Sequence, residues 1–539
     1  MKRKGDISVH GRTSPSVVHS VRVLLGSGVV DLRRPVLTLQ SSLAVRTRGP
    51  IAGAAFIAAR RRPDDVAVID DDGPLTYGEL DLRTNALARA ITAAGVAEGD
   101  AVGVLCRDHR GVIEVMVAAG KSGARLVLLN TGFAPPQLAD VLVREGVKLL
   151  IADAEFDALL AAAPDHVTTA VVGGPAAGPH LVVDDLVAAH STDRLPAPSR
   201  QGGLVLLTGG TTGTPKGAPR QVGSPLAAAQ FLERIPQRRG DVLLIAAPTF
   251  HGTGLSQLIL AMALGSTVVL RRRFDAEATV RAVEQHRVTM LVLVPTMLQR
   301  ILALEDLAAH DTSSLRIILC AGAALPAELG DRATAAFGPV VHNLYGCTEV
   351  ALATVATPED WAAAPGTAGR PPRGVQVALF DADDQPVTAS GVSARIFVSN
   401  GLRFEGYSGG GTKPTIGAFM GTGDTGHWDD DGRLFVDGRD DDMIVSGGEN
   451  VFPGEIEQVV GTLDGVVDVA SLPVDDVEFG TRLRLFVVTD GSAPVDADLV
   501  KAHVRSHLAR FKVPREVVVV EAIPYTPTGK VDRRVLATL

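Results

Sequence analysis

Cysteine, aromatic residues and net positive charge are all scarce in this sequence. Three cysteines occur among 539 residues, which is too few for a disulfide framework or a four-ligand zinc site and favours a reducing compartment. Aromatic residues make up 4% of the chain and the net charge is −9. A nucleic-acid-binding protein needs a basic field and usually aromatic stacking platforms. We therefore expect no nucleic-acid partner and predict a cytoplasmic location.

A long uninterrupted hydrophobic run is also missing. No charged residue occurs between Val242 and Leu270, but polar and glycine residues at 248–254 interrupt this stretch. The clean apolar part, Leu258–Leu270, is shorter than the ~20 residues that a membrane-spanning helix needs. The pattern instead predicts a buried strand, a polar loop, a buried helix and a second strand.

Strands and helices alternate after residue 50. Apolar spacing predicts a helix around Leu80–Ile91, and strands at Ala101–Cys106, Arg125–Leu129 and Val147–Ile151, with further helices between them. This alternation is typical of parallel βαβ units. The fold class is therefore predicted to be α/β, with a large N-terminal domain of layered sheets.

A charged break between Asp429 and Asp442 precedes a region of about 100 residues that has its own apolar pattern. It is large enough for a small, mobile α+β domain. The predicted units are a basic arm (1–50), a large domain (51–438), a hinge (439–442) and the small domain (443–539).

The arm carries a net charge of +7, which leaves −16 on the rest of the chain. Within it, an apolar stripe at helical spacing follows Ser14-Pro15 and comprises Val17, Val18, Val21, Leu24 and Leu25. Two interpretations remain open at this level. One is a helix packed on the body, and the other is a basic amphipathic helix that contacts the inner face of a membrane.

The strongest chemical signal is the glycine- and hydroxyl-rich segment Leu207–Gly217, which directly follows an apolar strand. Glycine lets the backbone approach a ligand, and N–H groups, hydroxyls and Lys216 form an anion cradle. A Walker A loop would end in Gly-Lys-Ser/Thr, whereas here Pro215 precedes Lys216 and Gly217 follows it. No G-x-G-x-x-G opens a βαβ helix, so the nicotinamide fingerprint is also missing.

This segment resembles the phosphate-binding loop of the adenylate-forming superfamily, which includes acyl-CoA synthetases. Further matches follow in the family's order, namely Ala321–Pro326, Asn343–Glu349, Thr422–Asp424, Gly438–Asp441, Ser446–Val451 and Pro524–Lys530. With a further match at Leu75-Thr76-Tyr77, they extend from about Leu75 to Lys530. Gly209 departs from the serine that many relatives have in the loop, and the usual Trp before Thr422 is missing.

The resemblance implies roles for single residues. Tyr345 would stack on adenine, Thr348 would contact the α-phosphate, and Glu349 would hold Mg²⁺, which prefers hard carboxylate oxygens. Asp424 would accept hydrogen bonds from the ribose hydroxyls, and Arg439 would contact the nucleotide. The residues implied to bind ATP or coenzyme A are Thr208, Gly209, Gly210, Thr211, Thr212, Gly213, Lys216, Gly322, Ala323, Asn343, Tyr345, Gly346, Thr348, Asp424, Arg439, Gly447 and Gly448.

The same resemblance implies the catalytic residues Lys530, Glu349, Thr208 and His251, with Glu349 as the metal ligand. His251 stands where amino-acid adenylation domains usually have an aspartate that pairs with the substrate's ammonium, so an amine-free acid is favoured. An acyl pocket is expected past His251, Gly252, Thr253, Ala323, Gly346 and Cys347. Gly254, Leu255, Leu258 and Ile259 would form its apolar wall, with room left by the glycine.

The predicted function is ATP- and Mg²⁺-dependent activation of a fatty acid to acyl-AMP, with pyrophosphate release, followed by transfer to coenzyme A. Two alternatives remain. One is an acyl-AMP ligase that loads a separate carrier protein. The other is a nucleotide-binding protein with weak or no turnover.

Overall fold

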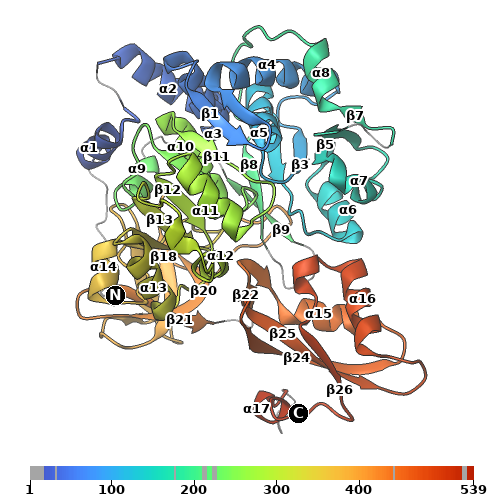
Figure 1. Cartoon of the computed structure of the whole chain (residues 1–539). Helices are drawn as coiled ribbons and strands as arrows, with labels where there is room; N and C mark the ends of the chain where they lie inside the picture. Colours follow the sequence, from blue (N-terminus) through green and yellow to red (C-terminus); the bar gives the residue numbers. More distant parts are fainter. Residues whose placement is uncertain are drawn as a thin grey trace, which may run out of the picture.

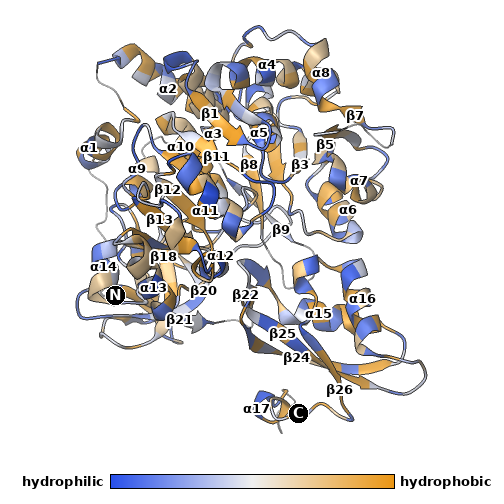
Figure 2. Cartoon of the chain, viewed as in Figure 1, coloured by the Kyte–Doolittle hydropathy of each residue, from blue (hydrophilic) through white to orange (hydrophobic). Residues whose placement is uncertain are grey.

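The chain forms a large N-terminal domain and a smaller C-terminal domain, drawn in orange and red in Figure 1. The computed structural model describes residues 17–30, 33–174, 178–208, 215–220, 227–440, 443–524 and 531–539. The predicted α/β class, with a large and a small domain, is confirmed. The central strands of the large domain are hydrophobic (Figure 2), and their side chains form its main core.

One sheet of the large domain has seven strands in the order β7-β6-β5-β3-β4-β8-β9, parallel except for β9. Its strands are β3 (Ala101–Leu105), β4 (Arg125–Leu128), β5 (Val147–Asp153), β6 (Thr168–Val172), β7 (Leu181–Val182), β8 (Leu204–Thr208) and β9 (Lys216–Arg220). The helices of this region are α4 (Tyr77–Ala93), α5 (Arg110–Ser122), α6 (Pro135–Arg144), α7 (Asp157–Leu160) and α8 (Val183–Ala189). The βαβ prediction is therefore confirmed.

A second sheet has eight strands in the order β15-β14-β13-β12-β10-β11-β1-β2. Its strands are β1 (Val66–Asp70), β2 (Gly73–Thr76), β10 (Val242–Ile245), β11 (Thr267–Val269), β12 (Met290–Leu293), β13 (Ile317–Ala321), β14 (Val341–Tyr345) and β15 (Thr354–Ala356). The accompanying helices are α9 (Ala228–Leu232), α10 (Gly252–Leu264), α11 (Ala276–Gln285), α12 (Pro295–Leu302), α13 (Ala327–Phe337) and α14 (Pro358–Ala363). The stretch Val242–Leu270, which contains no charged residue, thus folds as predicted, into β10, a polar turn, α10 and β11.

The third sheet is antiparallel and leads to the small domain. It contains β16 (Gln376–Phe380), β17 (Pro386–Val387), β18 (Ala394–Ser399), β19 (Thr415–Ile416), β20 (Phe419–Trp428) and β21 (Leu434–Arg439). The small domain contains β22 (Ile444–Ser446), β23 (Glu449–Val451), α15 (Pro453–Val460), β24 (Val466–Asp476), β25 (Gly480–Thr489), α16 (Ala497–His507), β26 (Glu516–Val519) and α17 (Arg533–Leu536). Short 3₁₀ segments are η1 (Ala154–Phe156), η3 (Leu307–Ala309) and η4 (Arg510–Lys512). The small domain has a hydrophobic core of its own.

Three helices precede the sheets, namely α1 (Val17–Ser27), α2 (Pro35–Arg48) and α3 (Pro50–Arg61). Helix α1 packs on the body through Leu24, which is 2% exposed, so the packed-helix interpretation is confirmed. The apolar stripe was predicted to pack on the body, and this is wrong for its first two residues, because Val17 and Val18 are 65% and 79% exposed. The helix instead buries Ser20, Leu24 and Ser27, which share one face at i, i+4 and i+7.

Candidate active site

A cavity of about 1010 Å³ lies between the sheets and extends from the small domain to the N-terminal helices. Most of the predicted site residues that the structure describes line it, namely Thr208, His251, Gly322, Ala323, Asn343, Tyr345, Gly346, Thr348, Asp424, Arg439 and Gly448. Lys216, Glu349 and Gly447 are not among its lining residues. The predicted residues Gly209, Gly210, Thr211, Thr212, Gly213, Asp441 and Lys530 lie outside the described residues.

Several of these residues lie at or directly after the end of a strand. Thr208 ends β8, Tyr345 ends β14, and Gly322 directly follows β13. Functional groups in α/β proteins gather at the carboxyl ends of parallel strands, where the chain leaves the sheet. The Thr208 hydroxyl is buried and has no hydrogen-bond partner within the described part of the chain. Burying a hydroxyl without a hydrogen bond destabilises a protein, so this oxygen is suited to form a hydrogen bond with a ligand.

Asp424 joins two of the predicted nucleotide-binding residues. Its carboxylate accepts a hydrogen bond from the Tyr345 hydroxyl at 2.6 Å and from Arg439 Nη1 at 2.6 Å. Asp424 and Arg439 are cross-strand neighbours on β20 and β21, which explains their pairing. Burial, and then the charge of Asp424, raise the pKa of Tyr345, so its hydroxyl keeps the proton that it donates. A carboxylate has about four acceptor sites, so Asp424 retains capacity for further donors.

Tyr407 connects Glu349 to Lys216. The Tyr407 hydroxyl donates to Glu349 Oε1 at 2.6 Å, and Lys216 Nζ lies 5.4 Å from the centre of the Tyr407 ring. Burial, and then the Glu349 charge, raise the pKa of Tyr407. Glu349 itself is 6% exposed. The phenol therefore fixes one carboxylate oxygen of Glu349 and leaves the other for a second partner.

Arg220 is a site residue that sequence reasoning missed. It ends β9, lines the cavity, and donates through Nη2 to the Thr348 carbonyl oxygen. Its Nε is buried without a hydrogen-bond partner among the described residues. Burial lowers the pKa of Arg220, and the nearby Cys347 and Glu349 oppose that shift. An arginine four residues after Lys216, inside a strand, was the signal available in the sequence.

The two domains meet at His251. Glu449 from the small domain lies 2.9 Å from His251 Nε2 and accepts hydrogen bonds from Asn130 Nδ2 at 3.1 and 3.2 Å. Glu449 belongs to the hairpin β22–β23, whose turn residues Gly447 and Gly448 have φ values of +60° and +89°. Two consecutive positive φ angles require glycine in such a two-residue turn. The segment Ser446–Val451, which the resemblance singled out, is thus held against His251, where the acyl pocket was predicted.

The charges of this interdomain pair stabilise each other. Burial by itself would lower the pKa of His251, but the charge and hydrogen bond of Glu449, followed by the charge of Asp108, raise it. Burial would raise the pKa of Glu449, but His251 and the hydrogen bond from Asn130 lower it. The pair is therefore ionised over a wider pH range than either group would be alone.

We expect the docking of the small domain to weaken as the pH rises through the raised pKa of His251. A histidine whose pKa is raised by pairing stabilises the paired state below its ordinary pKa of ~6.5, and this contribution is lost as pH passes the raised value. Dyes on Val143→Cys and Leu499→Cys, which lie on the contacting helices α6 and α16, would report docking by energy transfer. In Glu449→Gln the pH dependence should vanish, and an unchanged dependence would contradict the prediction.

The remainder of the cavity is largely apolar. Leu255 and Ile259 line it as predicted, together with Met116, Leu128 and Phe231, and its far end is formed by α2 and α3. Two predicted wall residues are wrong, because Gly254 and Leu258 do not line the cavity. A Cβ on Gly254 would lie 2.5 Å from the carbonyl oxygens of Ala247 and Pro248. Gly254 therefore permits close packing of α10 against the backbone of Ala247 and Pro248, and its missing side chain does not enlarge the cavity.

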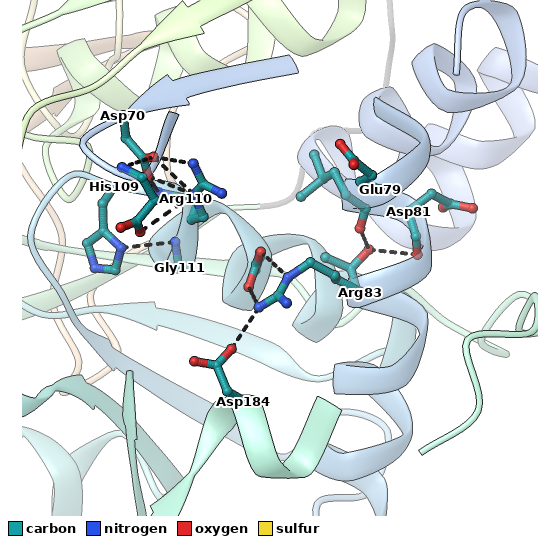
Figure 3. Close-up of polar contacts among 12 residues, drawn as sticks. Asp70, Glu79, Asp81, Arg83, His109, Arg110, Gly111 and Asp184 are labelled. Atoms are coloured by element: carbon teal, nitrogen blue, oxygen red, sulfur yellow. Dashed lines mark hydrogen bonds and ion pairs between the residues drawn. The ribbon is translucent and has the colours of Figure 1, made fainter. Parts of the chain in front are cut away.

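Cys106, His109 and Asp153 form a buried cluster with the spacing of metal ligands. His109 Nε2 lies 2.7 Å from Asp153 Oδ1, and Nδ1 accepts the backbone N–H of Gly111 at the start of α5 (Figure 3). Both ring nitrogens are thus used within the fold. Next to them, Arg110 pairs with Asp70 at 2.5 Å and ties α5 to β1 (Figure 3). His109 of the cluster caps α5, and the neighbouring Arg110–Asp70 pair joins the two sheets.

The C-terminal end of the small domain lies far from the cavity in this arrangement. Helix α17, the first helix after position 530, lies at the end of the small domain that is remote from the large domain (Figure 1). The hairpin β22–β23, in contrast, contacts the large domain through Glu449. The two ends of the small domain therefore cannot both face the cavity in one fixed arrangement.

The two-domain fold is that of the adenylate-forming enzymes, and Thr208, Tyr345, Asp424 and His251 line its cavity. Residues 56–408 match the family model described as AMP-binding enzyme, and residues 455–530 match the AMP-binding enzyme C-terminal domain. The chain belongs to the AMP-binding enzyme family. The resemblance seen in the sequence motifs is therefore confirmed.

Similar proteins cover nearly the whole chain. A feruloyl-CoA synthase from Amycolatopsis sp. is 35% identical over 485 residues, which are 88% of this chain and 95% of that protein. The fatty acid–[acyl-carrier-protein] ligase ScoC from Streptomyces coeruleorubidus is 31% identical over 497 residues, 89% of this chain and 94% of that protein. The amide bond synthetase McbA from Marinactinospora thermotolerans has a TM-score of 0.82 at 27% identity, covering 89% of this chain and 99% of that one. Among the described residues, no helix has the length and apolar character needed to cross a membrane.

Proposed function

We propose that this protein is an acid–CoA ligase that converts a fatty acid and ATP to acyl-AMP and pyrophosphate, and then transfers the acyl group to coenzyme A. The observation that carries the proposal is one continuous cavity. It joins the Tyr345–Asp424–Arg439 group to the His251–Glu449 contact and then to an apolar end behind α2 and α3. Its volume is at the upper end of the roughly 300–1,000 Å³ that is typical of ligand pockets, which suits a nucleotide and an acid together.

In the first half-reaction, one oxygen of the substrate carboxylate attacks the α-phosphorus of ATP, and the bond to pyrophosphate breaks. Negative charge then gathers at the α-phosphate and on the leaving group. Preorganised donors aimed at developing charge supply the largest part of such catalysis. We assign this role to the Thr208 hydroxyl, the glycine-rich loop, Lys216 and Lys530. Arg220 adds a buried positive charge beside Thr348.

Glu349 is suited to hold the magnesium ion that accompanies ATP. Mg²⁺ in nucleotide sites is usually held by one or two carboxylates and by the substrate phosphates. Glu349 is buried and retains one carboxylate oxygen that the Tyr407 hydroxyl does not occupy. The Thr208 hydroxyl, which has no hydrogen-bond partner among the described residues, is a second oxygen donor. When bound, the ion would neutralise phosphate charge.

In the second half-reaction, the coenzyme A thiol attacks the acyl carbon of acyl-AMP, so that a thioester forms and AMP leaves. Gly447 and Gly448 would border the path of the thiol. The side chain of Val294 lies 3.1 Å from the position of a Cβ on Gly448, so the hairpin and the large domain meet at this point. The contact between His251 and Glu449 would hold the hairpin in place during this step.

Product analysis tests the function and its alternatives. The protein would be incubated with ATP, Mg²⁺ and a panel of fatty acids and ferulic acid, with and without coenzyme A. Acyl-CoA from fatty acids supports the proposal. Feruloyl-CoA alone would assign an aromatic acid, as in the relative from Amycolatopsis. Acyl-AMP without acyl-CoA would favour a carrier-protein ligase, and no product at all would favour a nucleotide-binding protein.

Filling the far end of the cavity should change chain-length preference. Ala263 on α10 lines that end, and we expect Ala263→Phe to lower kcat/KM for palmitic acid roughly tenfold or more, because a packed site tolerates added atoms poorly. Octanoic acid should be used as before, since it would not reach this position. Ala161→Phe, at an exposed site, is the control. Equal losses for both acids would contradict a chain-length role.

A further inference from the structure

Helix α2 has an exposed apolar face. Val36, Leu39 and Leu43 are 66%, 72% and 61% exposed, and their spacing of i, i+3 and i+7 places them on one side of the helix. Arg46, one turn further on, is also exposed. The opposite side presents Thr38, Ser41, Ser42 and Val45 to the cavity. The helix therefore turns its more polar side inward and its apolar side to solvent.

Arginines gather at the N-terminal end of this helix. A second cavity of about 290 Å³ is lined by Arg33, Arg34, Arg61, Arg62 and Arg239, together with Ala58, Ala263, Leu264 and Gly265. Arg61 donates to the Val29 carbonyl and to the Ser41 hydroxyl, and Arg62 pairs with Asp65 at 3.0 Å. Among the residues that the structure describes, no acidic side chain lines this cavity, and the described segments 17–30 and 33–50 contain none; Asp31 lies outside them.

The aliphatic row and the arginines of this surface restrict the class of partner that it can bind. Exposed aliphatic side chains in a row mark an interaction surface. The adjoining arginines attract a partner that carries anionic groups, and guanidinium groups pair well with phosphate. A second copy of the chain does not fit, because a symmetric contact would set the same positive patch against itself.

We propose that the exposed face of α2 and the adjoining arginine cavity bind the surface of an anionic phospholipid bilayer. Lipid phosphates would occupy the arginine cavity, and Val36, Leu39 and Leu43 would enter the boundary between headgroups and acyl chains. Helices α1 and α2 lie at the side of the molecule away from the small domain (Figure 1), so docking there leaves the small domain free to move. This proposal does not depend on the proposed function.

Vesicle co-sedimentation of the full chain tests the proposal without any substrate. We expect binding to phosphatidylglycerol–phosphatidylcholine vesicles at low salt and little binding to pure phosphatidylcholine. Arg33→Glu combined with Arg34→Glu, and separately Leu39→Ser combined with Leu43→Ser, should each lower the partition coefficient roughly tenfold or more. Matched controls are Arg403→Glu with Arg505→Glu, and Val477→Ser, which change exposed residues elsewhere. Thermal unfolding and turnover of a water-soluble acid should be unchanged in every variant.

Several outcomes would overturn the proposal. Equal sedimentation of the α2 variants and the controls would show that this face does not bind. Loss of binding only when residues 1–16 are deleted would assign it to the segment before α1. Self-association that the Leu39 and Leu43 changes abolish, without vesicle binding, would assign the face to a second copy. If the unaltered protein makes no acyl-CoA but binds vesicles, and the α2 variants lose that binding, the proposed function fails and the membrane proposal stands.

Discussion

Lys530→Ala is expected to lower the rate of acyl-AMP formation by roughly 10²–10³-fold, the typical loss when one preorganised electrostatic contact is removed. Thioester formation from supplied acyl-AMP should be largely retained. The reason is the position of the small domain. Its hairpin β22–β23 contacts the large domain beside the cavity, whereas α17 lies at the remote end (Figure 1). A rotation of the small domain between the two steps would bring each end to the cavity in turn.

The two half-reactions would be measured separately, as pyrophosphate release and as acyl-CoA formation from synthetic acyl-AMP. Lys501→Ala is the control, because Lys501 is a lysine of the same domain whose ammonium donates to the Arg515 carbonyl oxygen, at 3.2 Å. Asp441→Pro should restrict the predicted hinge and slow the thioester step while adenylation is retained. Equal losses in both half-reactions for Lys530→Ala would argue for one static site.

Asp424→Ala is expected to lower adenylation by a similar factor, roughly 10²–10³-fold, and to raise KM for ATP. The substitution removes the carboxylate that accepts hydrogen bonds from both Tyr345 and Arg439. It also leaves the Arg439 guanidinium without its 2.6 Å ion pair beside the cavity. A partly buried charge that loses one of its partners is less well compensated for its desolvation, so the local geometry should change as well.

Two further variants separate these effects. Tyr345→Phe removes only the hydroxyl and keeps a ring for stacking, so its loss should stay within about tenfold, the cost of one hydrogen bond. Asp384→Ala is the control, because Asp384 also pairs with an arginine, Arg395 at 2.7 Å, but is largely exposed. Thermal unfolding would show whether Asp424→Ala is folded. Normal adenylation by a folded Asp424→Ala would contradict the assignment of this carboxylate to the nucleotide.

Residues from several predicted segments line one cavity, but the sequence did not predict which distant residues they contact. Tyr345 and Asp424 were both predicted to bind the nucleotide, because each belongs to a short run whose residue types suit one chemistry. Their direct hydrogen bond was not predicted, since it depends on the path of β14 relative to β20. The contact of His251 with Glu449 was missed for the same reason, as 198 positions separate the two residues.

The arm shows the same limit at the level of the fold. Helical spacing correctly predicted a helix from Val17, but the side that packs could not be read, because several arrangements of a short apolar stripe are almost equally periodic. The wall function expected of Gly254 was wrong, because a glycine next to a cavity and a glycine beneath a helix look alike in a sequence. Only the carbonyl oxygens of Ala247 and Pro248, 2.5 Å from its missing Cβ, distinguish the two.

The sequence by itself therefore determined the α/β class, the order of the strands and helices along the chain, and the family, because local periodicity and short contiguous runs of residues encode each of them. The tertiary structure alone decided which charges meet, which side chains line the cavity, and which face of α2 remains exposed. These features depend on how separate sheets and two domains pack together. That packing is the sum of many weak contacts between residues far apart in the chain, and no single segment contains it.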